Sequence, residues 1–157
     1  MGSQKIQCAM KTIFDNPTRD ELIHRINTLN ENSTAQWGTM NMYQMLKHCS
    51  LSEEMYLGKK TYNRVFMGRL FGQMALKNVL KDERPLMRNA KTPPELRIKE
   101  TNGDFTSERK KWIGLIEEYK YFSKPDIVHW FFGTMTKEQI GLFAYKHTDH
   151  HLRQFNS

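Results

Sequence analysis

The segment TKEQIGLFAYKHTDHHLRQF, residues 136–155, decides the fold. It opens with Thr136 and Gln139, which are spaced as a capping box and so mark the first turn of a helix. Residues that share one helical face then recur at intervals of three and four: Ile140, Phe143, His147 and His151. This spacing predicts an amphipathic helix over residues 136–155 whose inward face carries two histidines.

The same helical spacing of apolar residues recurs in three earlier parts of the chain. It predicts helices over residues 18–30, 41–57 and 106–122. No sustained alternation of apolar and polar residues indicates a β-strand, so the expected fold class is all-α, a four-helix bundle with one long crossover loop. The chain, residues 1–157, suits a single domain, and we expect residues 1–14 to form a flexible N-terminal tail.

A fifth apolar stretch, residues 62–80, predicts a further helix packed across one side or end of the bundle. Its apolar residues form a broad face: Val65, Phe66, Leu70, Phe71, Met74 and Val79. We expect this face to point into the core. Two alternatives stay open: the face lies on a membrane surface, or two subunits of a homodimer share it.

Residues 88–104 contain a Pro-Pro pair at 93–94 and an Asn-Gly pair at 102–103, and they show no helical period. A connection of this length without structure of its own is uncommon and is typically a lid or a functional loop. We therefore expect a crossover loop that covers the functional site. A second irregular segment, the aromatic turn HWFFG at residues 129–133, precedes the last helix.

The positive charge is concentrated in the middle of the chain. The chain carries 24 Lys and Arg against 17 Asp and Glu, a formal charge of +7, and residues 59–99 alone hold eleven bases and three acids. A basic surface can meet nucleic acid, an anionic membrane or a small acidic substrate, although a merely solvated face is the simplest interpretation. No spacing typical of a helix-turn-helix, RNA-binding or zinc-finger module accompanies the charge, which argues against a nucleic-acid partner.

Cysteine content and hydropathy indicate the compartment. Two cysteines cannot form a disulfide framework, and no apolar run approaches the ~18 residues of a membrane span. The N-terminal residues also lack the apolar stretch of a secretory signal. We therefore expect a cytoplasmic protein without a membrane partner.

The residues with the clearest chemical potential are histidines. His147 and His151 lie four residues apart on the inner face of the last expected helix, and His48 has a similar inward position in the helix over residues 41–57. Burying three imidazoles together is costly unless their nitrogens find partners, and a divalent metal ion supplies one. Spacing alone leaves two alternatives: hydrogen-bonded core histidines without a metal, and His150 in place of His151.

The neighbouring side chains have weaker claims to a role in such a site. Cys49 adjoins His48, but a buried, inert thiol is the more common role of such a residue. Asp149 and Gln154 are close enough in sequence to orient the histidines, yet helical geometry points Asp149 away from the pair. His129, in the aromatic turn, could reach the mouth of the site as an acid, a base or a substrate contact. The alternative is a histidine that packs the loop.

Several motifs resemble the DinB/YfiT-like superfamily, and more closely a branch of it catalogued as a domain of unknown function. Residues 37–49, WGTMNMYQMLKHC, look like its first histidine motif, and residues 91–96, KTPPEL, resemble the same branch. The most specific match is HWFFG at 129–133 followed by KHTDHHLRQF at 146–155. The resemblance covers residues 15–156, nearly the whole chain.

The resemblance implies a four-helix bundle of up-down-down-up topology and a metal ion held by three histidines. Residue by residue, the first ligand falls on His48, and the HxxxH pair falls on His147 and His151. The chain departs from the expected pattern at Trp130, where we expect proline after the loop histidine; this departure affects the loop geometry and not the ligands. The metal stays open among zinc, nickel, iron and manganese.

Superfamily relatives include metal-dependent thiol transferases and hydrolase-like proteins. Three histidines leave open positions on a metal, where a water of lowered pKa or a substrate thiolate can bind. We therefore expect a metal-dependent enzyme that activates water or a thiol and acts on a small anionic or thiol-containing substrate, with His129 as the candidate catalytic residue. The alternatives are a non-enzymatic metal- or ligand-binding protein of the stress response and a nucleic-acid-binding protein.

Overall fold

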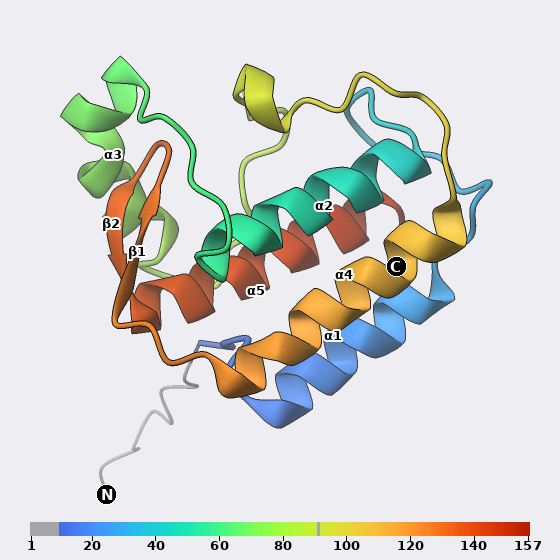
Figure 1. Cartoon of the computed structure of the whole chain (residues 1–157), viewed down its shortest axis with the longest axis horizontal. Helices are drawn as coiled ribbons and strands as arrows, with labels where there is room; N and C mark the ends of the chain where they lie inside the picture. The colour runs from blue at the N-terminus through green and yellow to red at the C-terminus, as the bar shows by residue number, and fades with distance from the viewer. Residues whose placement is uncertain (1–9, 91) are drawn as a thin grey trace, which may run out of the picture.

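The computed structural model describes residues 10–90 and 92–157 of the chain (Figure 1). This part of the chain is mostly helical, as the spacing predicted, and contains five α-helices and one small hairpin. The helices are α1 (Asn16–Thr28), α2 (Met42–Tyr56), α3 (Phe66–Val79), α4 (Phe105–Glu118) and α5 (Lys137–Gln154). The hairpin strands are β1 (Asp126–His129) and β2 (Gly133–Thr136), and the short 3₁₀ helices are η1 (Pro94–Leu96) and η2 (Tyr119–Tyr121).

Four helices, α1, α2, α4 and α5, enclose the hydrophobic core. α2 packs against α4 and α5, and α1 packs against the same two helices; α4 runs beside α1 in Figure 1. Each helix contributes buried side chains to the shared core: Leu22 and Ile26 from α1, Met45 and Leu46 from α2, Trp112 and Ile116 from α4, and Ile140 and Ala144 from α5. Among the described residues, none of the helices combines the length and the apolar character of a membrane span.

The residues just before α1 are packed onto the core. Ile13 is fully buried, and its backbone N–H donates to the carbonyl of Gly141 in α5 (3.1 Å). The Phe14 ring packs edge-on against Tyr119, with ring centroids 5.8 Å apart. The flexible tail expected over residues 1–14 therefore does not include these two positions, and the first nine residues lie outside the described part of the chain.

The hairpin is the main departure from the all-α expectation. β1 and β2 pair antiparallel, with Asp126 opposite Thr136 and His129 opposite Gly133. Gly133 has φ +81°, the left-handed conformation that closes a three-residue hairpin loop. Each strand is four residues long and alternates buried and exposed side chains, too short a run to be recognised from spacing. The hairpin packs on α5, α2 and α3, so helices stabilise a strand pair that would be marginal alone.

α3 contacts the rest of the molecule through glycines. Gly68 and Gly72 face the backbone of the hairpin loop, where an added Cβ would lie only 2.4 and 2.2 Å from the carbonyl oxygen of Phe131. A residue without a side chain permits this close approach. Leu76 is the one large side chain of α3 that is buried.

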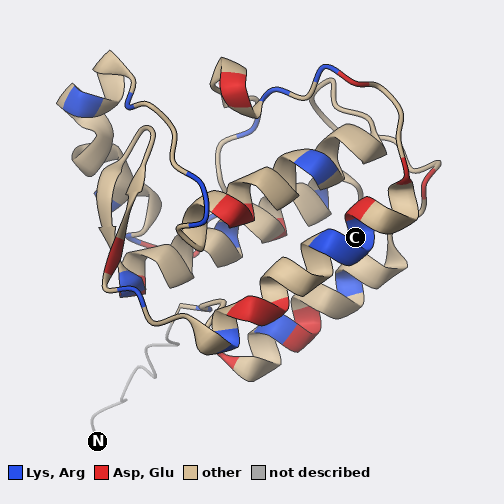
Figure 2. Cartoon of the chain, viewed as in Figure 1, with Lys and Arg blue, Asp and Glu red and all other residues tan. Residues whose placement is uncertain are grey.

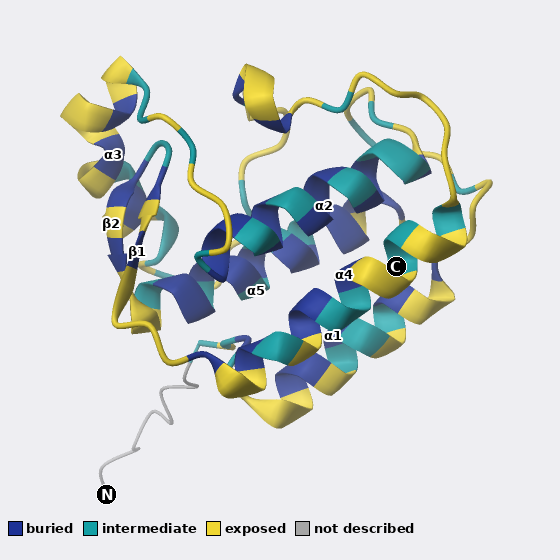
Figure 3. Cartoon of the chain, viewed as in Figure 1, coloured by how far each residue is buried: buried dark blue, intermediate teal, exposed yellow. Residues whose placement is uncertain are grey.

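The expectation that the apolar face of residues 62–80 points into the core is therefore wrong for its large residues, whereas Val79 is partly buried and packs against the core. The large apolar residues lie on the outside of the molecule, and Figure 3 shows exposed turns along α3. Their side chains are Phe66, Met67, Leu70, Phe71 and Met74. Assigning the inner face by residue size fails here because the closest helix packing needs the smallest residues, and these form the opposite side of α3.

The connection from α3 to α4 runs along α2. Gln44 of α2 donates from Nε2 to the carbonyl of Ile98 (3.1 Å), and Leu96 of η1 is buried. The loop expected over residues 88–104 is thus tied to α2 near His48. This attachment places part of the loop beside the histidine that the sequence singled out.

A carboxyl group lies inside the helical core. Glu53 of α2 is fully buried; the Tyr119 hydroxyl donates to one of its oxygens and the Thr148 hydroxyl to the other (2.9 Å). Burial raises the pKa of Glu53 from 4.5 to about 7, although both hydrogen bonds act in the opposite direction. The folded protein therefore keeps Glu53 protonated at pH values where the unfolded chain ionises it.

Replacing Glu53 by Gln is expected to change how stability depends on pH. Between pH 4.5 and about 7 the carboxyl is protonated in the folded protein and ionised in the unfolded chain. This group therefore lowers the free energy of unfolding by roughly 3 kcal/mol as the pH rises through that window. The Glu53→Gln amide does not titrate, so the variant lacks this part of the slope.

Urea unfolding of both proteins at several pH values measures the difference. Glu117→Gln, on the exposed side of α4, is the matched control and should keep the slope of the unmodified protein. A stability difference between Glu53→Gln and the unmodified protein that does not change with pH would contradict the prediction.

Candidate metal centre

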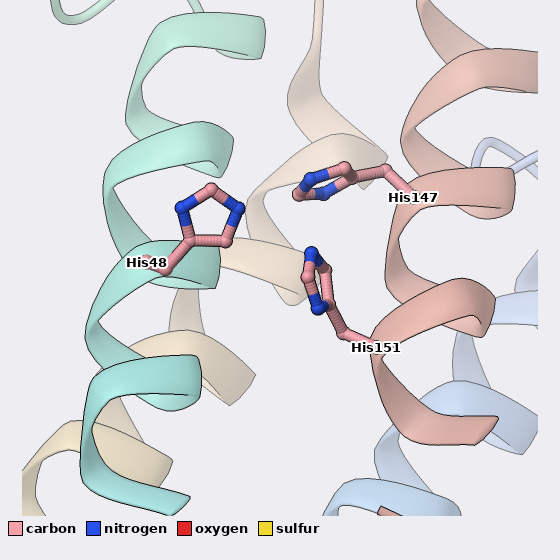
Figure 4. Close-up of side chains that lie close together, drawn as sticks. All are labelled: His48, His147 and His151. Atoms are coloured by element: carbon pink, nitrogen blue, oxygen red, sulfur yellow. The ribbon is translucent and has the colours of Figure 1, made fainter. Parts of the chain in front are cut away.

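Three histidines from two helices meet in the interface between α2 and α5. His147 and His151 lie on successive turns of α5, with ring centroids 4.6 Å apart. His48 of α2 lies opposite, its ring centroid 5.4 Å from that of His147 and 4.9 Å from that of His151. Figure 4 shows the rings pointing toward one another, and one nitrogen from each ring lies within 4.8 Å of the other two. The structure thus brings together the three histidines that the sequence singled out.

Two of the rings are held through the nitrogen that faces away from the centre. His48 Nδ1 lies 3.2 Å from the Leu96 carbonyl oxygen, and His151 Nδ1 lies 2.9 Å from Gln154 Oε1. Gln154 is itself oriented, because its Nε2 donates to the Trp37 carbonyl (2.8 Å). Since both partners are acceptors, each Nδ1 carries the proton, and the Nε2 lone pair of a neutral ring is left free.

His147 differs from the other two histidines. Its Nδ1 is buried and has no hydrogen-bond partner among the described residues. Buried polar atoms almost always have a partner, and one without a partner calls for an explanation such as an ion. Among the three rings of the cluster, His147 is therefore the one with a buried nitrogen that no described residue satisfies by a hydrogen bond.

All three rings are neutral near pH 7. Burial lowers the pKa of His48, and it lowers the pKa values of His147 and His151 well below the ordinary value for histidine. The positive charge that each neighbouring histidine would carry adds to this effect. Neutral imidazole is the form that binds a metal ion, so the fold holds the rings ready for coordination.

The donor set fits a divalent metal ion. Imidazole nitrogens suit zinc, nickel, iron and copper. Tetrahedral coordination at about 2.0–2.1 Å places ligand nitrogens about 3.4 Å apart, so modest side-chain rotations would close the present separations. Within the described residues no carboxylate or thiol joins the three histidines. Three protein ligands leave coordination positions for water or substrate, as in catalytic sites.

His129 lies one aromatic layer away from the cluster. It contacts Tyr56 and Phe143, and both of these rings contact His147. Burial, together with the charge of Arg64, lowers the pKa of His129 to about 3. The ring is therefore neutral at physiological pH.

His129 has a structural task in the hairpin loop. Its Nδ1 accepts hydrogen bonds from the backbone N–H groups of Phe131 (3.1 Å) and Phe132 (3.2 Å). These two bonds leave Nε2 as the protonated nitrogen and hold the loop between β1 and β2. The catalytic role expected for His129 stays a prediction, whereas its role in packing the loop is visible in the structure.

The remaining candidates lie outside the cluster. His150 is half-buried beside the Trp37 ring, and His24 is exposed on α1. Cys49 is fully buried, its thiol contacts the sulfur of Met45, and burial raises its pKa well above the ordinary value. A neutral, enclosed thiol agrees with the inert role expected for Cys49.

Asp149 and Gln154, the two polar neighbours of the histidines on α5, have different contacts because they point to different sides of the helix. Asp149 pairs with Arg25 (2.8 Å) and Arg153 (2.7 Å), away from the histidines, as expected. Gln154 lies three residues after His151, on the same side of the helix, and this spacing could have identified it as the orienting residue. The Leu96 carbonyl gave no such signal, because any residue type presents a backbone oxygen.

The similarity to known proteins extends over the whole of this site. A family model matches residues 10–157, a range that includes all three histidines. No curated protein and no solved structure matches the chain. Because the match spans far more than half of its length, the chain belongs to the family described as Protein of unknown function (DUF1569).

Proposed function

We propose that this protein is a metal-dependent enzyme in which His48, His147 and His151 hold a divalent ion. The observation that carries the proposal is the convergence of one nitrogen from each ring, all within 4.8 Å of one another. The buried Nδ1 of His147 agrees with it, because an ion bound at this nitrogen would satisfy an atom whose lack of a partner costs about 1–3 kcal/mol.

The chain's own groups prepare the site for an ion. Leu96 and Gln154 orient two of the rings through Nδ1. Tyr56 and Phe143 pack against His147 and exclude water from that side of the cluster. A divalent ion bound there supplies Lewis-acid chemistry, which favours the deprotonated, nucleophilic form of water or of a thiol near neutral pH.

The reaction class that fits this chemistry is hydrolysis or thiol transfer on a small molecule. Zinc, nickel and iron are the candidate ions that an all-imidazole site favours, and manganese, which prefers oxygen ligands, fits it less well. The excess of Lys and Arg over residues 59–99 would attract a substrate that carries negative charge, such as an anionic thiol.

Membership of the DinB/YfiT-like superfamily, with its up-down-down-up bundle topology, belongs to the same proposal. It rests on the motifs at residues 37–49 and 146–155. A single domain over residues 1–157, a cytoplasmic location and His129 as an acid, a base or a substrate contact are further parts of it. The alternative of a non-enzymatic metal-binding protein shares the site and differs only in the absence of turnover.

Removing any one of the three histidines is expected to abolish tight metal binding. His48→Ala, His147→Ala and His151→Ala each leave two ligands. Affinity should therefore fall by more than the ~10–100-fold that loss of an outer hydrogen-bond partner costs. Calorimetric titration with zinc or nickel, on protein without a histidine tag, measures the change.

Two of the three histidines outside the cluster are the matched controls for this titration. His150→Ala and His24→Ala should bind like the unmodified protein, because neither ring belongs to the cluster. Equal binding by His147→Ala and the unmodified protein would remove the metal site and the enzyme proposal with it.

The hydrogen bond from His151 to Gln154 gives a second, finer prediction. Gln154→Ala should weaken metal binding by about 10–100-fold, because His151 loses the acceptor that orients its ring. Gln154→Glu keeps an oxygen for His151 but loses the amide that donates to the Trp37 carbonyl, so it should restore only part of the affinity. If Gln154→Ala and Gln154→Glu bind metal equally well, the orienting role is wrong.

Activity is tested with metal-loaded protein on panels of hydrolysis and thiol-transfer substrates. We expect turnover that is lost on chelation, restored by the metal, and absent from His147→Ala. Turnover that persists after chelation and in His147→Ala would contradict a metal-dependent enzyme. Tight metal binding without turnover on any class of substrate would favour the non-enzymatic alternative.

A further inference from the structure

The outward side of α3 is a continuous apolar surface, which we call the α3 apolar face. Its residues have exposed fractions between 45% and 72%. At 100° per residue they fall within an arc of about 140°, opposite the two glycines that rest on the hairpin. The residues of the face are Phe66, Met67, Leu70, Phe71 and Met74.

The α3 apolar face is large for a surface without a partner. Side chains of this size each have about 200 Å² of surface, so the observed fractions make a patch of roughly 500–600 Å². That is the upper end of what monomeric proteins expose, and patches of this size typically bind something. α3 also stands to one side of the four core helices, resting on β2 and the hairpin loop (Figure 1).

The charged residues of α3 itself are all basic. Residues 59–81 contain six Lys and Arg and no acid, and two acids, Asp82 and Glu83, follow after the helix. Arg69, Lys77 and Lys81 are exposed and make no ion pair within the described part of the chain. Figure 2 shows basic and no acidic positions on α3. An occupant of the α3 apolar face therefore meets a basic rim and is favoured if it carries negative charge.

This charge distribution opposes a second copy of the chain as the occupant. In an antiparallel pair centred on Leu70, Lys77 of one copy lies beside Asn63 of the other, at the positive N-terminal end of its α3. In a parallel two-fold pair, Lys77, which falls within the same arc as the face, lies beside Lys77 of the other copy. The patch is also smaller than the ~800 Å² that each partner buries in a standard interface.

We propose that α3 lies on an anionic lipid surface, with the α3 apolar face in the boundary between headgroups and acyl chains. Arg69, Lys77 and Lys81 then meet the lipid phosphates and carboxylates, so apolar burial and charge act together, as in interfacial amphipathic helices. This departs from the expectation of no membrane partner and takes up the membrane-surface alternative that the sequence left open for residues 62–80. The attachment is peripheral and independent of the metal centre.

The proposal is tested by sedimenting the full-length protein with lipid vesicles. Binding is expected to vesicles that contain about one third phosphatidylserine and not to vesicles of phosphatidylcholine alone. Raising the salt from about 0.1 M to 1 M shortens the Debye length from ~10 Å to ~3 Å and should release much of the bound protein. Chelated and metal-loaded protein should bind alike, which separates this test from that of the proposed enzyme.

Matched variants separate the apolar and the charged contributions. Phe66→Ser combined with Leu70→Ser should lose vesicle binding, whereas Met87→Ser, an exposed apolar residue outside α3, should keep it. Lys77→Gln should weaken binding about fivefold, the effect of one base near an anionic surface. Lys110→Gln, an exposed base on α4, is its control. Far-ultraviolet circular dichroism checks that each variant is folded.

Three results would overturn the proposal. The first is equal binding to neutral and anionic vesicles, or none to either. The second is vesicle binding that survives in the Phe66→Ser/Leu70→Ser variant. The third is a dimer in light scattering without lipid that dissociates on Leu70→Ser, because this result would assign the α3 apolar face to a second copy of the chain.

Discussion

The burial of three imidazoles between α2 and α5 is the constraint on which the rest of the structure depends. Each ring brings two nitrogens into an interior where an unpaired polar atom is costly. The surrounding chain meets part of that demand, since the Leu96 carbonyl binds His48 and Gln154 binds both His151 and the Trp37 carbonyl. The ring nitrogens that face away from the centre thus bind two loops that are far apart in the sequence, that of Leu96 directly and that of Trp37 through Gln154. The ring nitrogens on the other side face one another.

A second set of contacts connects this centre to the surface of the molecule. His147 contacts Tyr56, Tyr56 stacks on His129, and His129 holds the hairpin loop through two backbone N–H groups. The same loop is the surface on which Gly68 and Gly72 rest. The hairpin therefore joins α3 to the histidine cluster through direct packing, although it contributes no ligand to the cluster. This continuity makes the hairpin a structural part of the site.

The helices could be predicted because apolar spacing and capping act over a few residues. The capping box of Thr136 and Gln139 begins α5, as its spacing indicated. The hairpin and the orientation of α3 could not be predicted in this way. Four-residue strands are stabilised by the helices on which they pack, and α3 turns Gly68 and Gly72 inward because the hairpin loop lies so close. Both features depend on contacts between segments that are distant in the sequence.

The sequence by itself determined that His147 and His151 share one face, because residues four apart lie on successive turns of a helix with 3.6 residues per turn. It also indicated His48, through its inward position and its motif. Only the tertiary structure decided that the three rings converge and which atoms hold them. The approach of α2 to α5 is the result of packing throughout the core. The contact between His48 and Leu96 uses a backbone oxygen, which every residue type has, so the sequence cannot indicate it.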